Sequence, residues 1–175
     1  MARPTLAEFF ALARERENLR LRKEWREAKP WTEDPILRDN YFCNVFREDD
    51  RTTRWFREQV REPLHYEPAV VWATIVFRWF NYIPTGELIK SILLADGSAD
   101  ELETVLRPLQ QRGEKLFTGA FIVKSPNGTD KLSGILDCIR AADAFLNREA
   151  GRLTNTLEQA HEALQEIPFL GPFMA

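Results

Sequence analysis

The most apolar stretch of the sequence reads Ala69-Val70-Val71-Trp72-Ala73-Thr74-Ile75-Val76-Phe77-Arg78-Trp79-Phe80-Asn81. A helix that is apolar on every side is normally the central, buried helix of its domain, so this stretch predicts the core. Arg78 and Asn81 are its only strongly polar residues, and a buried arginine needs a partner or a cavity. Arg78 either pairs with an acid such as Asp50, or it lines a ligand cleft and meets phosphate or a base edge.

The sequence on both sides of this stretch predicts further helices joined by short connections. Thr5-Leu6-Ala7-Glu8 and Ser98-Ala99-Asp100-Glu101 are capping boxes, in which a hydroxyl and a carboxylate satisfy backbone N–H groups at a helix start. Asp49 or Asp50 is expected to cap a third helix. The helices are expected over about residues 5–28, 50–61, 69–82, 84–94, 98–111, 133–147 and 154–166.

This succession of helices predicts an all-α fold, a helical bundle in a single domain that covers residues 1–175. One segment, about residues 117–132, differs in character. Phe121-Ile122-Val123 is β-prone, and Asn127-Gly128 is a strong turn signal. We therefore expect a small loop or hairpin inserted between helices there.

The composition limits the classes of protein to which the chain can belong. Hydrophobic residues make up 44% and charged residues 29% of the chain, as in ordinary globular proteins. A net charge of -3 argues against a generally basic nucleic-acid-binding protein, but binding depends on where the charge lies. The longest apolar run is too short to span a bilayer, and the charged start of the chain predicts no signal peptide. We expect a cytoplasmic, DNA-associated protein without a membrane partner.

Several kinds of site are not predicted. The two cysteines, Cys43 and Cys138, are far apart, which indicates a reducing compartment and gives no metal-ligand spacing. His65 and His161 are isolated in the sequence as well. There is no Gly-rich P-loop with its lysine, so the chain by itself cannot be a P-loop kinase. We expect no metal and no cofactor.

The end of the chain, Ile167-Pro168-Phe169-Leu170-Gly171-Pro172-Phe173-Met174-Ala175, resembles the helix-hairpin-helix of DNA glycosylases. In that motif a Leu-Pro-Gly-Val-Gly turn exposes backbone N–H groups at the start of a helix, whose positive dipole end suits a phosphate oxygen. Phe169 stands where the motif commonly has its first Gly, so the sequence does not predict whether the amide at this position faces a phosphate. The alternative is an ordinary connection between helices, in which Pro and Gly end one helix and form a turn.

A series of five arginines is the second candidate for phosphate binding. They are spaced by four, three, three and four residues, which places them on one face of a regular helix at about 100° per residue. Phe56 and Val60 would then face the core. The series is either a phosphate track or a solvated face paired with Glu48, Glu58 and Glu62. Its members are Arg47, Arg51, Arg54, Arg57 and Arg61.

Several strings of the sequence point to a known family. The strings resemble the helical domain of 5-hydroxymethyluracil DNA kinases, which is shared with the α-glutamyl/putrescinyl thymine pyrophosphorylases, or amino acid:DNA transferases. The resemblance covers about Phe9 to Ala175. The strings are Trp31 to Leu37, Phe42 to Arg51 with its Asn-Val-Phe-Arg, Phe77 to Asn81, Gly119 to Val123, Pro126 to Gly128 and Ile167 to Phe173.

The resemblance implies a DNA-glycosylase-like helical fold that acts in thymine hypermodification. In that pathway 5-hydroxymethyluracil in DNA is phosphorylated, and an amine such as an amino acid displaces the activated group. The chain would be, or belong to, the transferase, with DNA as its partner and a separate P-loop DNA kinase as a further one. Candidate residues for DNA or phosphate are Asn44, Arg47, Arg51, Arg54, Arg57, Arg78, Asn81, Pro168, Phe169, Leu170 and Gly171.

The resemblance also implies that family members continue beyond the hairpin. We therefore expect the chain to be truncated at Ala175, with glycosylase-type catalytic acids or lysines beyond it. A competing hypothesis is a non-catalytic helical module that partners a 5-hydroxymethyluracil DNA kinase or a transferase. It predicts an exposed apolar patch near the C-terminus and no DNA affinity. A third is an inactive fragment.

Overall fold

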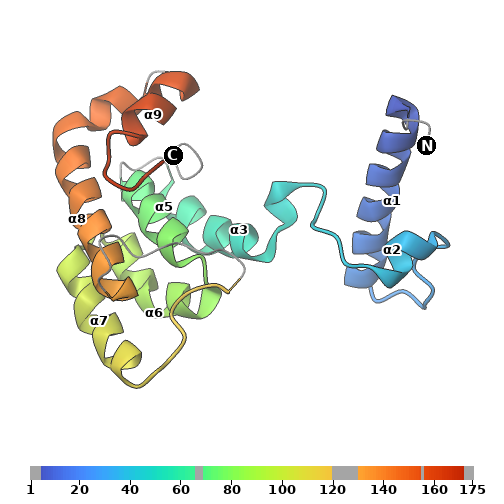
Figure 1. The fold of residues 1–175 in the computed structure, drawn as a ribbon, viewed down its shortest axis with the longest axis horizontal. Helices are drawn as coiled ribbons and strands as arrows, with labels where there is room; N and C mark the ends of the chain where they lie inside the picture. Colours follow the sequence, from blue (N-terminus) through green and yellow to red (C-terminus); the bar gives the residue numbers. More distant parts are fainter. Residues whose placement is uncertain (1–4, 66–68, 120–129, 155, 172–175) are drawn as a thin grey trace. The chain divides into compact units, whose positions relative to one another are not determined.

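The computed structural model describes residues 5–65, 69–119, 130–154 and 156–171 (Figure 1). Every regular element in these ranges is helical, which confirms the all-α fold. The chain divides into two compact units, residues 1–54 and 55–175. The single domain expected from the sequence stays a prediction, as does the likeness to the glycosylase bundle. Among the described residues, no helix is both long and apolar enough to cross a membrane.

The first unit is built on helix α1, Leu6–Glu24. The expected capping box begins it, because the Thr5 side chain accepts from the Glu8 N–H while the Glu8 carboxylate accepts from the Thr5 N–H. The helix ends at Glu24, four residues before the expected Ala28. Arg26 adopts a φ of 57°, which turns the chain back so that the Glu27 N–H donates to the Arg22 carbonyl at 3.0 Å.

The loop after α1 is fastened to the helix around Trp31. The Trp31 indole N–H donates to the Glu27 carbonyl at 2.8 Å, and Arg22 donates to the Trp31 carbonyl at 2.6 Å. Lys23 and Lys29 place their ammonium groups 5.2 and 4.8 Å from the indole ring. The loop leads into helix α2, Pro35–Asp39, and then into the 3-10 helix η1, Arg47–Asp49.

The helical segment that follows η1 is not a regular α-helix throughout. Asp50 caps helix α3, Arg51–Phe56, by accepting from the N–H groups of Thr52 and Thr53, as expected. Residues 57–61 then form a π-helix, η2, before the short helix α4, Glu62–Leu64. Pro63 supplies a physical reason, since it has no N–H to donate to the carbonyl four residues earlier and its ring crowds that carbonyl.

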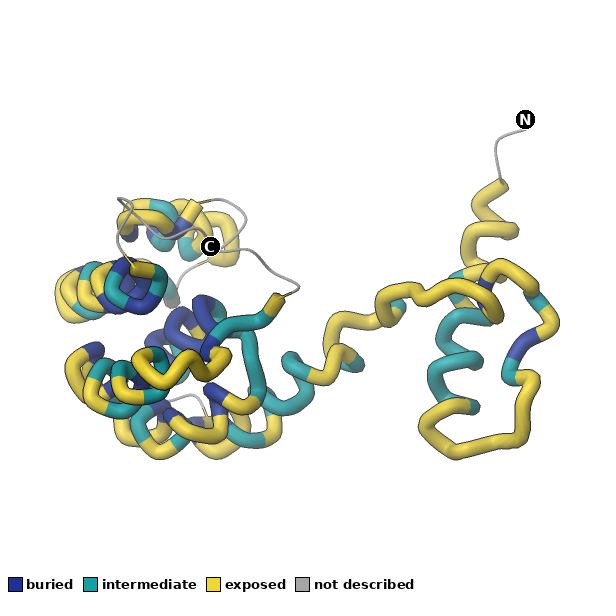
Figure 2. The backbone as a smooth tube through the Cα atoms, turned by 60° about the horizontal axis from the view of Figure 1, so that its bottom comes forward, coloured by how far each residue is buried: buried dark blue, intermediate teal, exposed yellow. Residues whose placement is uncertain are grey.

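The second unit packs around α5, Ala69–Phe80, which is buried along most of its length, as the sequence predicts. Helices α6, Ile83–Leu94, and α8, Lys131–Glu149, pack on α5, and α7, Ala99–Gln111, packs on α6 and α8. The 3-10 helix η4, Ala150–Thr154, joins α8 to α9, Leu157–Leu164. Figure 2 shows the buried residues concentrated in this unit, whereas exposed and half-buried residues dominate the first.

Two aromatic contacts and one close approach fix the centre of the second unit. The Phe56 ring stacks on Phe77 with 5.2 Å between centroids, and Val60 is fully buried, so both face the core as expected. Trp55 packs on the same Phe77 ring. Gly86 permits this, because a Cβ on Gly86 would lie 2.5 Å from the Trp55 ring.

The connections between these helices are closed by specific caps. Asp96, at a φ of 50°, ends α6 so that the Gly97 N–H donates to the Ile92 carbonyl at 3.0 Å, and the Ser98 capping box begins α7 as predicted. Asp130 caps α8, which begins two residues before the expected Ser133. The expected strand-like run Phe121–Val123 and the Asn127–Gly128 turn lie outside the described residues.

Candidate nucleic-acid interface

The turn after α9 is the first candidate site. Ile167 and Leu170 are buried, and the Leu170 N–H donates to the Ile167 carbonyl at 3.0 Å, which closes a four-residue turn. Pro168 and Phe169 occupy its two central positions and are exposed. Phe169 has a φ of 69°, the left-handed conformation that glycine adopts without cost. The backbone at Phe169 thus has the conformation favoured by the glycine of the motif.

The amide groups of this turn are the feature that could bind an anion. Within residues 156–171 and the other described ranges, the N–H groups of Phe169 and Gly171 donate to no carbonyl. The preceding N–H groups are used, since Glu166 and Ile167 donate to Ala163 and Leu164. The second helix expected for a helix-hairpin-helix falls on residues 172–175, outside the described part, so that motif stays a prediction.

A salt bridge holds the base of the turn. The Arg152 guanidinium donates twice to the Glu166 carboxylate, at 2.6 and 2.8 Å. This bidentate pair lowers the pKa of the Glu166 carboxyl. It joins η4 to the segment that follows α9, so it positions the start of the turn.

The arginine series is divided among several elements. Arg47 lies in η1, Arg51 and Arg54 in α3, and Arg57 and Arg61 in the π-helix η2. Because a π-helix turns less per residue than an α-helix, the 100° spacing assumed from the sequence does not hold across residues 57–61. The common face of all five arginines stays a prediction.

The acids near the series pair with some of its members. Arg54 lies 3.4 Å from the Glu24 carboxylate and 3.7 Å from Asp49. Arg57 lies 3.2 Å from Glu58 and 3.6 Å from Glu62, two of the acids expected in the solvated-face interpretation.

Arg51 differs from these two arginines. It is exposed at the start of α3, and its side chain makes no hydrogen bond or ion pair with any residue in the described ranges. Its charge is therefore available to an external anion.

Arg78 and Asn81 lie at the end of the buried helix α5. Both are half-buried, and Arg78 already interacts with other groups of the chain. Asn81 has a φ of 43°, and its N–H donates to the Phe77 carbonyl at 2.7 Å. Asn81 thus ends the helix, a role that suits Asn because it tolerates this conformation better than most residues. The expected pairing of Arg78 with Asp50, which lies in the first unit, stays a prediction.

Asn44 lines a pocket of about 110 Å³ in the first unit that the sequence did not predict. Its apolar lining, here called the floor, consists of buried Leu37 and half-buried Leu19, and the other lining residues, here called the rim, supply cations, carboxamides, aromatic rings and a thiol. No carboxylate is among the described residues that line it. The rim includes Arg16, Lys23, Tyr41, Phe42, Cys43 and Asn44.

Three contacts hold residues that line this pocket. The Asn44 side-chain amide donates to the Asp49 carbonyl at 2.7 Å. The Arg16 guanidinium donates to the Cys43 carbonyl and lies 5.4 Å from the centre of the Phe42 ring. The family resemblance gave Asn44 as a candidate, but no sequence pattern indicated the pocket, because its residues come together from α1, from α2 and from the irregular segment after α2.

Comparison with known proteins gives two matches. The family model described as the 5-hmdU DNA kinase helical domain matches residues 3–175. A curated relative, the 5-hmdU DNA kinase of Bacillus phage SP10, is 25% identical over 186 residues, which cover 95% of this chain and 29% of that protein. The chain therefore spans less than a third of the length of this relative. No solved structure matches the chain.

Proposed function

The chain belongs to the family of 5-hmdU DNA kinase helical domains, and from this premise we propose that it binds DNA that carries a 5-hydroxymethylated pyrimidine. The observation that carries the proposal is the turn at residues 167–171. Buried Ile167 and Leu170 hold the turn, and the N–H groups of Phe169 and Gly171 have no acceptor among the described residues. Unpaired amides in a fixed turn suit a phosphate oxygen, and such contacts position a protein on DNA without reading its sequence.

The arginine series supports the same proposal through one residue above all. Arg54 and Arg57 have carboxylate partners, whereas Arg51 is exposed and has none in the described ranges. An exposed cation without an acid beside it gains most from a phosphate, because binding releases counterions from the DNA. Arg47 is also exposed and is the second candidate, although its charge interacts with the Asp50 carboxylate.

The finer form of the proposal is a transferase role in thymine hypermodification. An amine nitrogen would attack the methylene carbon of a pyrophosphorylated 5-hydroxymethyluracil. The carbon–oxygen bond would break, pyrophosphate would leave with the electron pair, and the attacking nitrogen would lose its proton to the solvent. Arg47 and Arg51 would stabilise the charge of the leaving pyrophosphate.

The test is equilibrium binding of the chain to duplex DNA with and without 5-hydroxymethyluracil. We expect Arg51→Ala to weaken binding several-fold at low salt on both duplexes, because it removes a contact with the DNA backbone. The slope of the logarithm of the affinity against the logarithm of the salt concentration should become shallower by about one. Arg148→Ala is the control, since Arg148 is an exposed arginine on α8 that is not among the candidate residues for DNA. Absence of any affinity at low salt would overturn the proposal.

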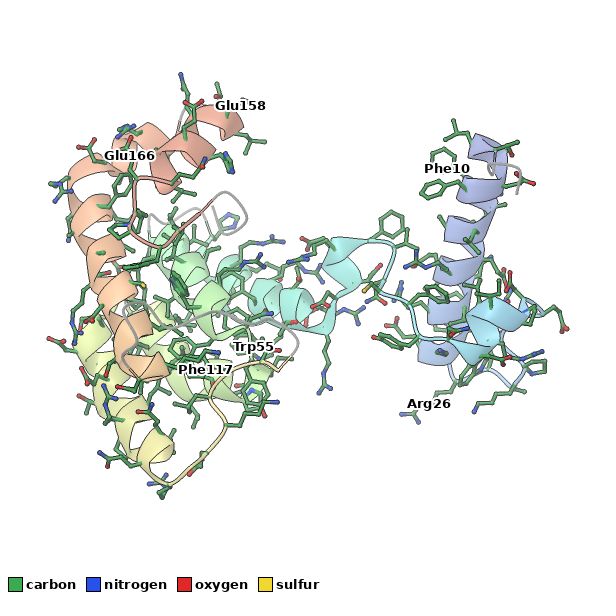
Figure 3. All side chains as sticks on the ribbon, viewed as in Figure 1. Phe10, Arg26, Trp55, Phe117, Glu158 and Glu166 are labelled. Carbon is green, nitrogen blue, oxygen red and sulfur yellow. The ribbon has the colours of Figure 1, made fainter. Side chains whose placement is uncertain are left out.

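A second candidate function is a non-catalytic module that partners a kinase. The observation that favours it is the exposed apolar face of α1, where Leu6, Phe9 and Phe10 are each more than half exposed. Figure 3 shows the Phe10 side chain projecting from the first half of α1, away from α2. Leu157, near the C-terminus, is also exposed.

The partner hypothesis predicts a different outcome. The chain should then bind a P-loop 5-hydroxymethyluracil DNA kinase and lose that binding in Phe10→Ser. Duplex DNA should not bind at any salt concentration.

A further inference from the structure

The pocket in the first unit is a binding site that the proposed function leaves unassigned. It holds about 110 Å³, of the order of the ~150 Å³ cavity that accommodates a benzene ring. One planar ring therefore fits, whereas a base pair does not. Its apolar floor of Leu19 and Leu37, with polar groups at the rim, has the character of a small-molecule site.

The charge of the rim selects the kind of ligand. Arg16, Arg20 and Lys23 line the pocket without a carboxylate among the described lining residues. Arg20 is already neutralised, because its guanidinium lies 2.6 Å from both Glu17 and Glu24. Arg16 and Lys23 remain to attract an anion.

Arg16 is held in place before any ligand arrives. Its guanidinium donates to the Cys43 carbonyl and lies over the Phe42 ring. Its Nε atom is buried and has no hydrogen-bond partner among the described residues. A buried donor without an acceptor is uncommon in a folded protein, and a ligand beside it offers one explanation.

Tyr41 supplies the face for the ring. It is 91% exposed beside the pocket, an unusual position for a large aromatic side chain with no packing role. An exposed aromatic ring next to fixed cations is the combination with which proteins bind unpaired nucleotides, because every base has a face to stack.

We propose that this pocket binds one unpaired pyrimidine nucleotide of a DNA strand, with the base stacked on Tyr41 and the phosphate beside Arg16 and Lys23. This inference rests on the proposed function, because it names the part of the DNA that the first unit would hold. The target pyrimidine must leave the base stack before chemistry can reach it. A pocket for a single ring would hold such a nucleotide.

The thiol of Cys43 gives a site-specific readout. Cys43 is exposed and lines the pocket, whereas Cys138 is fully buried, and burial raises the pKa of its thiol to about 11. N-ethylmaleimide should therefore modify the folded chain at Cys43 alone. Intact mass then measures how far a short oligothymidine protects Cys43. Fluorescence anisotropy of the labelled strand gives its affinity in parallel.

We expect oligothymidine to protect Cys43, and an abasic strand of equal length to protect it much less. Tyr41→Ala should weaken strand binding about 5- to 150-fold, the usual loss for a stacked base, whereas Tyr41→Phe should keep it. Arg16→Gln should weaken binding and Arg14→Gln should not, since Arg14 is an exposed arginine two positions along α1 that does not line the pocket. Tyr41 is almost fully exposed, so its variants test the site without a folding defect.

Three results would overturn the inference. If oligothymidine binds while Cys43 is alkylated at the unliganded rate, the strand binds elsewhere, and the pocket is refuted while DNA binding stands. If thymidine monophosphate protects Cys43 as well as the strand does, the ligand is a free nucleotide. If neither strand nor duplex binds at low salt, the proposed function fails together with the inference.

Discussion

Replacement of Phe169 tests whether the turn after α9 is held in the left-handed conformation. Phe169 has a φ of 69° and is 52% exposed. About half of a phenylalanine surface is then buried, on the order of 100 Å², which contributes up to about 2 kcal/mol. A non-glycine residue at this φ costs about 1–2 kcal/mol. The contact and the strain therefore act in opposite directions.

Two variants separate these contributions. Phe169→Ala loses the contact and keeps the strain, so we expect the free energy of unfolding to fall by about 1–2 kcal/mol. Phe169→Gly loses the same contact but relieves the strain, so it should be more stable than the alanine variant by about 1 kcal/mol. Urea unfolding followed by circular dichroism measures the difference, which corresponds to about 2–4 °C in Tm. An alanine variant as stable as the glycine variant would refute the left-handed turn.

Three further changes test the fold by urea unfolding. Gly86→Ala should lower the free energy of unfolding by about 1–3 kcal/mol, because the new Cβ would lie 2.5 Å from the Trp55 ring; an unchanged midpoint would contradict this packing. The Asp143 carboxyl accepts a hydrogen bond from the Trp72 indole N–H, and burial raises the pKa of this carboxyl. The contribution of Asp143 to the free energy of unfolding is therefore fully present below the pKa of the unfolded chain. It is lost as the pH rises through the pKa of the folded chain. Asp143→Asn should accordingly stabilise the chain near neutral pH and not in acid, and equal effects at both would exclude this cause. Asp130→Ala should lower the free energy of unfolding by about 1 kcal/mol, because the α8 cap is lost. Hydrogen bonding, chiefly from the Gln110 amide, holds the pKa of the Asp130 carboxyl well below its usual range. The stabilising contribution of Asp130, and with it the effect of the substitution, should therefore shrink as the pH falls below the pKa of the unfolded chain toward the lower pKa of the folded chain.

The elements set by local physics could be predicted from the sequence. The apolar stretch 69–81 is the buried helix α5, and the capping boxes at Thr5 and Ser98 begin α1 and α7. Phe56 and Val60 face the core as their spacing indicates. These features depend on residues that lie a few positions apart, so they can be predicted from one sequence.

The helix boundaries that differed depend on single backbone conformations. Arg26 in the left-handed region ends α1 at Glu24, although arginine is not a residue that signals a stop there. Pro63 accompanies the π-helix at residues 57–61, which changes the angular spacing of the arginine series. Neither event follows from hydrophobic periodicity, which assumes a regular helix.

The candidate sites were predictable only in part. The turn at residues 167–171 was visible as a motif, but the two amides without an acceptor in the described part of the chain depend on the burial of Ile167 and Leu170. The partners Glu58 and Glu62 of Arg57 lie nearby in sequence, whereas Glu24, the partner of Arg54, is 30 residues away. The pocket of the first unit depends on such a distant contact as well, because Arg16 and Cys43 are 27 residues apart.

The central claim is that this helical domain binds the DNA backbone. The most direct measurement is the affinity of the 175-residue chain for duplex DNA containing 5-hydroxymethyluracil across a salt series. If Arg47 and Arg51 each contact one phosphate, the logarithm of the affinity should fall linearly with the logarithm of the salt concentration, with a slope of about −2. No binding at the lowest salt concentration, or an affinity independent of salt, would contradict the claim.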